Sequence, residues 1–173
     1  RQQEVDRHMP LFMKACKTIK ANNPDLKIAV GLAPNVRLNQ NYTDIEVVEK
    51  DNTHQLLAAS DMLFTASGTA TLEAAILGVP MGVVYKLNII TWMLSKWLIK
   101  IKYIALPNII FNKLIVPEFI QSNANPNAMI NYAQQLINDK EFRKSTSMEL
   151  TKIKNILGDP GASDRAAQKI LED

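Results

Sequence analysis

The sequence predicts an α/β fold, in which a parallel sheet carries helices on both faces and the chain ends in several helices. Apolar runs and amphipathic stretches alternate along the 173 residues, a pattern typical of parallel strands joined by helical crossovers. The clearest unit is residues 62–85: an apolar run, a small-residue turn, a short helix closed by Gly78 and Pro80, and a second apolar run. The length suits one domain with a sizeable core.

The other elements follow from periodicity and from helix start and stop signals. A helix is expected over residues 9–23, because Pro10 suits a first helical turn. We expect a buried strand at 27–32, another at 44–48 and a short helix at 53–59. A helix over 88–100 precedes an irregular stretch that holds Asn108. Three amphipathic helices are expected at the end, over residues 127–138, 140–157 and 162–171.

Composition and charge narrow the class of protein. The chain is 47% hydrophobic and 21% charged, as expected for a globular domain, and no apolar run reaches the ~18 residues that a membrane-spanning helix needs. The net charge of +3 and the pI near 9.0 favour acidic partners. No helix-turn-helix, zinc-finger or RNP-like pattern is present, so nucleic acid is not an expected partner.

Cysteine and histidine give little sign of redox or metal chemistry. Cys16 is alone, which rules out a disulfide framework, suits a reducing cytoplasm and indicates packing within a helix. His8 and His54 are isolated and are interpreted as surface or capping residues. Without a Cys/His cluster or an Asp-x-Asp pattern, the sequence predicts no metal and no cofactor.

The turn Ser67-Gly68-Thr69 is the strongest candidate site. It follows a predicted strand and opens a helix, so backbone amides and the positive end of the helix dipole would face the carboxyl edge of the sheet. This arrangement binds phosphate or diphosphate. Gly68 would let the backbone approach an anion closely, and the Ser67 and Thr69 hydroxyls could donate hydrogen bonds.

Glu73 sharpens this hypothesis. A capping box would need Ser or Thr at the position of Ala70, so Glu73 is not committed to its own helix end. Glu73 lies one turn after Thr69 on the same face, where a carboxylate can accept two hydrogen bonds from the vicinal diol of a ribose. The alternative is a capped core helix whose Glu73 is simply solvated, and the pattern alone does not choose between the two.

Several motifs occur in order at close spacing and resemble the lipid-A-disaccharide synthase family of glycosyltransferases. The resemblance covers essentially the whole chain, and its Leu-Pro-Asn and Val-Pro-Glu-x-x-Gln segments are the most specific. The opening residues match the end of a Gly-Ser-Arg-x-x-Glu motif. The matching segments are Arg1-Gln2-Gln3-Glu4-Val5, residues 67–73, 80–86, 103–108 and 116–121, Gly161-Ala162-Ser163 and Arg165-Ala166-Ala167.

The resemblance implies a fold and a function. Members of the family have two Rossmann-like domains in the GT-B arrangement, and residues 1–173 resemble the C-terminal one, a single domain that holds the UDP-sugar donor. The implied reaction joins UDP-2,3-diacylglucosamine to 2,3-diacylglucosamine 1-phosphate, a glycolipid acceptor. The catalytic base would then come from the missing N-terminal domain, so the fragment alone is expected to be inactive. The implied location is the bacterial cytoplasm, at the periphery of the inner membrane.

The resemblance also implies further site residues. Arg1 matches an arginine associated with the donor diphosphate and with catalysis. Asn108 is expected in a loop at the sheet edge, where its amide would contact uracil or a sugar hydroxyl, or else would only stabilise a turn. Tyr85, Lys86 and Lys113 are candidate sugar or phosphate contacts.

The chain departs from the family pattern after Asn108. The family shows a Gly-Arg-Glu stretch there, whereas this chain has Phe111-Asn112-Lys113-Leu114. Lys113 keeps a positive charge without the bidentate fork of arginine, and Leu114 cannot replace an acid. Glu118 is either a site acid or a first-turn acid of a helix behind Pro117.

Residues 88–100 suggest a second kind of contact. Trp92 and Ile99 lie among Lys96 and Lys100, outside the apolar stripe of the expected helix. This combination is typical of an anchor at a bilayer surface with anionic lipid. The alternative is contact with the missing domain or with a partner subunit.

Three functions therefore remain open at the level of sequence. The first is the donor-binding half of the transferase. The second is a UDP-sugar epimerase, or another UDP-N-acetylglucosamine transferase, of the same fold. The third is a non-enzymatic α/β binding module in which the Ser67-Gly68-Thr69 turn merely begins a helix. The ordered motifs favour the first.

Overall fold

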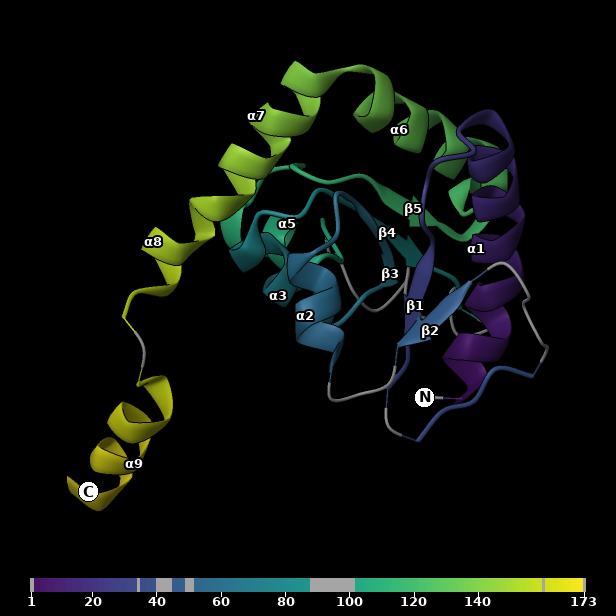
Figure 1. Cartoon of the computed structure of the whole chain (residues 1–173). Coiled ribbons are helices and arrows are strands. Elements are labelled where there is room, and N and C mark those ends of the chain that lie inside the picture. Colours follow the sequence, from purple (N-terminus) through teal and green to yellow (C-terminus); the bar gives the residue numbers. More distant parts are fainter. Residues whose placement is uncertain are drawn as a thin grey trace.

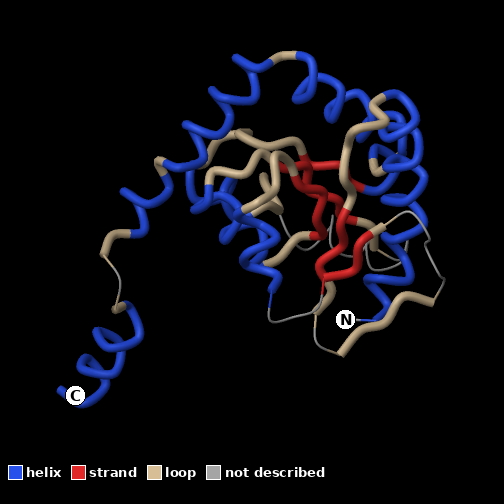
Figure 2. The backbone as a smooth tube through the Cα atoms, in the orientation of Figure 1, coloured by secondary structure: helices blue, strands red, loops and turns tan. Residues whose placement is uncertain are grey.

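The computed structural model (Figures 1 and 2) describes residues 2–33, 35–39, 45–48, 52–87, 102–159 and 161–172. All strand pairs among these residues are parallel. One sheet pairs β1 (Ala29–Gly31) with β2 (Glu46–Val48). The other has the order β3 (Leu63–Ala66), β4 (Met81–Tyr85), β5 (Glu118–Ile120). The predicted α/β class is confirmed.

Helices cover both faces of the β3-β4-β5 sheet. On one face, α1 (Gln2–Asn22) and α6 (Pro126–Asn138) pack together over Val84 and Phe119. The other face carries most of the remaining helices around Met81 and Val83. These are α2 (Thr53–Ala58), α3 (Thr69–Leu77), α5 (Leu106–Phe111), α7 (Lys140–Thr151) and α8 (Ile153–Leu157). Side chains of successive β4 residues thus pack into the cores on opposite faces of the sheet, because side chains alternate between the two faces of a strand.

Two glycines allow this close packing. A Cβ on Gly82, in β4, would lie 2.7 Å from the Phe119 ring and 2.8 Å from the Phe64 ring, so only glycine lets both rings approach the strand. Gly78 ends α3 with a φ of 72°, and a Cβ there would lie 2.7 Å from Thr151 on α7. The predicted glycine stop of this helix is confirmed.

The N-terminal helix is longer than predicted. It begins at Gln2, so Pro10 lies in its interior rather than in its first turn. An interior proline costs one backbone hydrogen bond, and the burial of Met9 and Met13 in the same stretch offsets that cost. Tertiary packing has overridden the local start signal.

Other predicted elements also differ. The stretch that holds Asn108 forms α5 instead of an irregular loop, with Pro107 in the first turn. The expected helix over 140–157 is two helices, α7 and α8, that meet at Lys152. The first strand is shorter than expected and is not buried, since Ala29 and Gly31 are exposed. The expected helix over 88–100 lies outside the described residues.

The chain does end in several helices, as predicted, and the last of them stands apart. Figure 1 shows α9 (Ala162–Glu172) separated from the rest of the chain, with Ile170 and Leu171 exposed. Among the described helices, none has the length and hydropathy that crossing a membrane requires.

Candidate functional site

The site begins where β3 ends and α3 starts. Gly68 precedes the first helical residue, Thr69, and no side chain caps this end of the helix. Thr71, two residues after Thr69, is buried and turns inward, since its hydroxyl and its N–H both donate to the Gly68 carbonyl, over 2.7 and 3.1 Å. The amides of Thr69 and Ala70 belong to the first turn, where α-helical geometry provides no intrahelical acceptor. The end of α3 is therefore open to an anion.

The surroundings of this turn are also open. Gly68 and Thr69 are exposed, and a Cβ on Gly68 would meet no atom within 4 Å. The positive end of the α3 dipole adds to the attraction for negative charge. The turn offers a phosphate two amides and the Thr69 hydroxyl.

Ser67 does not contribute as predicted. Its hydroxyl donates to the Ile104 carbonyl over 3.0 Å, so its proton is committed to the protein. The expectation of two free hydroxyl donors is therefore wrong for Ser67. Its bond instead ties the α3 turn to the segment that leads into α5.

Glu73 is exposed on α3, one turn beyond Thr69. Within the described part of the chain, its carboxylate has no hydrogen-bond or ion-pair partner. A carboxylate that is free on the same helix face as an open N-terminus is placed to accept hydrogen bonds from a diol while the amides hold a phosphate.

Asn108 has a different place from the one predicted. Its side chain is 0% exposed within α5, and its amide group donates to the Val116 carbonyl over 2.8 Å and to Glu118 Oε1 over 2.9 Å. Its oxygen accepts from the N–H groups of Ile115 and Val116, at 2.9 and 3.1 Å. Both amide protons and both oxygen lone pairs are thus used by the protein, so Asn108 is part of the scaffold.

Glu118 belongs to the same cluster. It opens β5, and its carboxylate accepts from the N–H groups of Ile104 and Ala105 as well as from Asn108. The prediction of a first-turn acid in its own helix is wrong, because residues 118–120 form a strand. Ala105 is the N-cap of α5, so Glu118 satisfies amides that precede another helix.

The three further candidate contacts lie in different places. Tyr85 and Lys86 are at the carboxyl end of β4, next to the end of β3 and on the same sheet edge as the α3 turn. Lys113 instead pairs with Glu149 on α7 at 3.4 Å, and α7 packs against the C-terminal end of α3. The structure brings Lys86 to the site edge and leaves Lys113 away from it.

Some predicted residues lie outside the part of the chain that the structure describes. These are Arg1, Trp92, Lys96, Ile99 and Lys100. Within the described residues, no group of three His, Cys, Asp or Glu could hold a metal ion.

Sequence reasoning missed the role of His8. Its side chain is only 4% exposed, which corrects the interpretation as a surface or capping residue. Nε2 accepts the N–H of Lys86 at 3.2 Å, and Nδ1 faces the Glu4 carbonyl at 2.8 Å. The Phe12 ring stacks on His8. An aromatic residue four positions after His8 was the sign in the sequence that this face of the helix is buried. Cys16 agrees with its predicted packing role, since burial raises the pKa of its thiol to about 11.

The fold and the site define a class of protein. A parallel sheet with helices on both faces and an open helix N-terminus at its carboxyl edge is a Rossmann-like domain suited to phosphate-bearing ligands. A family model described as lipid-A-disaccharide synthetase matches residues 1–170. The chain belongs to the lipid-A-disaccharide synthetase family.

Individual relatives agree with this assignment. A lipid-A-disaccharide synthase of Anaeromyxobacter dehalogenans is 33% identical over 179 residues, which cover 99% of this chain and 46% of the relative. One from Nitrosococcus oceani is 34% identical over 165 residues, covering 91% and 42%. The chain thus spans a little under half the length of the curated relatives it matches.

A solved structure shows the same fold. It is described as a UDP-N-acetylglucosamine 2-epimerase from Listeria monocytogenes, and it superposes with a TM-score of 0.58 at 17% identity. The match covers 85% of this chain and 36% of that one. At this identity the likeness concerns the fold alone.

Proposed function

We propose that this chain is the UDP-sugar-binding part of a lipid-A-disaccharide synthase. The intact enzyme would transfer acylated glucosamine from UDP-2,3-diacylglucosamine to 2,3-diacylglucosamine 1-phosphate. Membership of the family and the names of the relatives support the reaction. The observation that carries the role of this chain is the uncapped end of α3 with an unpaired Glu73 one turn further on.

The proposed donor pose uses these groups directly. The diphosphate lies over the amides of Thr69 and Ala70, with the Thr69 hydroxyl as a further donor. The ribose diol donates to Glu73. Gly68 leaves the space through which the phosphate oxygens approach, since a side chain there would occupy volume that the protein leaves open.

In the proposed reaction, this chain holds the leaving group. An acceptor hydroxyl oxygen attacks the anomeric carbon, the bond from that carbon to the diphosphate oxygen breaks, and UDP departs with the bonding electron pair. The hydroxyl proton passes to a base, which we place in the other half of the enzyme. The end of α3 and Arg1 balance the charge that develops on UDP, so the scheme includes no metal.

The sheet topology and the length of the relatives favour a preceding segment in the intact protein. In the described residues, β1 and β3 belong to separate sheets and each pairs with one strand only. A doubly wound sheet has the strand order 3-2-1-4-5-6, in which β2, β1, β3, β4 and β5 correspond to strands 3, 2, 4, 5 and 6. We infer that a strand leading into α1 fills the remaining position, between β1 and β3.

The location of the intact enzyme is part of the same proposal. Its glycolipid substrates have acyl chains, so it would work at the inner membrane surface from the bacterial cytoplasm. Trp92, Lys96, Ile99 and Lys100 remain the proposed surface anchor. Binding of the chain to vesicles with anionic lipid, compared with a Trp92→Ser variant, tests this assignment.

Calorimetric titration with UDP, ADP and GDP tests the site. We expect UDP to bind more tightly than ADP or GDP, and Glu73→Ala to weaken UDP binding by about 1.5–3 kcal/mol, the range for hydrogen bonds to a charged group. Glu141→Ala, which removes an exposed acid on α7, is the matched control. Equal affinity for UDP and GDP, or identical behaviour of the two variants, contradicts the site assignment.

A second experiment tests the division between halves. The two lipid substrates are supplied to this chain alone, and then to this chain with a separately expressed N-terminal half. Disaccharide is expected only from the mixture, because the base is absent from this half. Disaccharide from this chain alone contradicts the proposal. Epimerised sugar from the donor without acceptor would instead identify an epimerase.

A further inference from the structure

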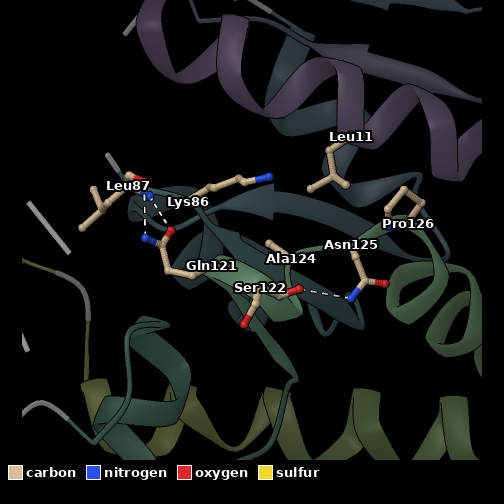
Figure 3. Close-up of a pocket in the computed structure, with 8 residues that line it drawn as sticks. All are labelled: Leu11, Lys86, Leu87, Gln121, Ser122, Ala124, Asn125 and Pro126. Atoms are coloured by element: carbon tan, nitrogen blue, oxygen red, sulfur yellow. Dashed lines mark hydrogen bonds between the residues drawn. The ribbon is translucent and has the colours of Figure 1, made fainter. Parts of the chain in front are cut away.

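A pocket of about 450 Å³ lies at the carboxyl ends of β4 and β5 (Figure 3). None of residues 67–73 lines it, so it shares no residue with the α3 contacts proposed for UDP. Its walls come from α1, from the residues after β4, and from the 3₁₀ turn η2 (Gln121–Asn123) with the start of α6. The lining residues are Leu11, Lys86, Leu87, Gln121, Ser122, Ala124, Asn125 and Pro126.

The pocket contains a cation without a partner. Figure 3 shows the Lys86 side chain extending across the pocket toward Leu11. Within the described residues, no carboxylate or hydrogen-bond acceptor pairs with its ammonium group. The Lys113 and Lys152 ammonium groups, by contrast, both pair with Glu149. The lining contains no acidic residue, so its charge is purely positive.

The main chain that carries Lys86 is fixed from α1. The Lys86 N–H donates to His8 Nε2 over 3.2 Å, and its carbonyl accepts from Arg7 Nη1 over 3.1 Å. Because Nε2 accepts, the ring proton is on Nδ1, which donates to the Glu4 carbonyl. Burial is the main cause that lowers the pKa of His8 below its ordinary value, so the neutral ring is favoured.

The next residue is fixed from the opposite side. The Leu87 N–H donates to Gln121 Oε1 over 2.8 Å, and Gln121 Nε2 donates back to the Leu87 carbonyl over 3.3 Å. Gln121 holds this position with a φ of 48°, in the left-handed region that costs a non-glycine residue energy. Four hydrogen bonds therefore hold the main chain of these two consecutive residues, and the Lys86 ammonium group remains free to meet a ligand.

We propose that this pocket is a second anion site, which takes the phosphate group of a sugar phosphate. Lys86 supplies the charge and the exposed Ser122 hydroxyl, which has no partner within the described residues, supplies a hydrogen bond. His8 and Gln121 are positioning residues that hold the peptide groups of Lys86 and Leu87. Leu11 and Pro126 give the sugar ring an apolar wall, as small-molecule pockets commonly do.

The identification of the bound group as a donor or an acceptor phosphate rests on the proposed function. The existence of an anion site in this pocket does not. A transferase with a UDP-sugar donor and a sugar 1-phosphate acceptor has two sources of phosphate. Both present the same chemistry to Lys86, so the test must separate them. Glucosamine 1-phosphate serves as the probe for one source and UDP for the other.

The test is calorimetric titration of the chain with each probe. Lys86→Met, which keeps an unbranched apolar side chain close in length to the lysine stem and removes the ammonium group, is expected to weaken the binding of one of the two probes by at least about tenfold. Lys144→Met removes an exposed lysine on α7 and is the control for net charge, with less than about a twofold effect expected. A specific loss for glucosamine 1-phosphate identifies the acceptor, and a specific loss for UDP identifies the donor.

The result that overturns the proposal is equal behaviour of Lys86→Met and Lys144→Met with both probes. This failure is distinct from failure of the UDP site, because Glu73→Ala reports on α3 independently.

The positioning role has its own readout. His8→Gln keeps an acceptor for the Lys86 N–H and is expected to retain probe binding. His8→Leu removes that acceptor and is expected to weaken the binding of the same probe that Lys86→Met affects.

The salt dependence of probe affinity distinguishes a loss of Lys86 positioning from a general loss of the fold. The affinity of a probe that contacts the Lys86 ammonium falls as ionic strength rises. We expect His8→Leu and Gln121→Leu to flatten this dependence while circular dichroism shows a retained fold. A steep dependence that persists in both variants contradicts the positioning roles.

Discussion

Two polar regions of this domain touch each other and are built in opposite ways. In the α3 turn (residues 67–70), two amides, a hydroxyl and the adjacent Glu73 face open space. In the Asn108–Glu118 network, both side chains are surrounded by protein partners, and Asn108 uses every hydrogen-bonding position it has. The Ser67 hydroxyl joins the two regions through the Ile104 carbonyl.

The difference separates ligand contact from scaffold. A buried polar group is tolerated only when it is satisfied, and a satisfied group has nothing left for a ligand. An open helix end gains from an anion because its amides are unsatisfied within the protein. Changes in the network should therefore alter folding stability, and changes in the turn should alter binding.

The largest expected effect is that of Asn108→Ala. It leaves the N–H groups of Ile115 and Val116 and the Val116 carbonyl without their side-chain partner, and it removes one of the donors to the Glu118 carboxylate. We therefore expect a loss of about 3–5 kcal/mol in the free energy of unfolding. Urea denaturation measures this loss. Asn131→Ala, at an exposed position of α6, is the control and should change stability by less than about 0.5 kcal/mol. Equal stability of the two variants would show that the network is not a scaffold.

Gly68→Val should affect binding instead. The added side chain meets no protein atom near its Cβ, so the fold is expected to survive, but it fills the space proposed for the diphosphate. We expect UDP affinity to fall by at least about tenfold, or about 1.4 kcal/mol. Calorimetry measures the affinity and circular dichroism the fold. An intact fold with unchanged UDP affinity would move the phosphate away from α3.

Ser67→Ala should have the smallest effect, and it tests the hydrogen bond that joins the α3 turn to the Asn108–Glu118 network. It removes one hydrogen bond to the Ile104 carbonyl, so we expect about 1 kcal/mol less stability. UDP affinity should change by less than about twofold, because the hydroxyl proton is already committed to the protein. A variant with full stability and strongly weakened UDP binding would return Ser67 to the set of ligand donors.

The unit β3–α3–β4 is the part that the sequence by itself determined. Its apolar runs, the small-residue turn, Gly78 and Pro80 lie within two dozen neighbouring residues, and each acts through local backbone geometry. The parallel α/β class followed from the same alternation along the chain. For that reason the placement of an open helix end at the carboxyl edge of the sheet could be predicted.

Only the tertiary structure decided which polar side chains already form hydrogen bonds within the protein. Asn108 became scaffold because α5 brings it against Val116 and Glu118, and His8 became buried because α1 meets Lys86, 78 residues along the chain. Gln121 holds Leu87 from 34 residues away. Hydrogen bonds of this kind depend on how helices and strands pack, and local periodicity contains no information about which distant partner a side chain will meet.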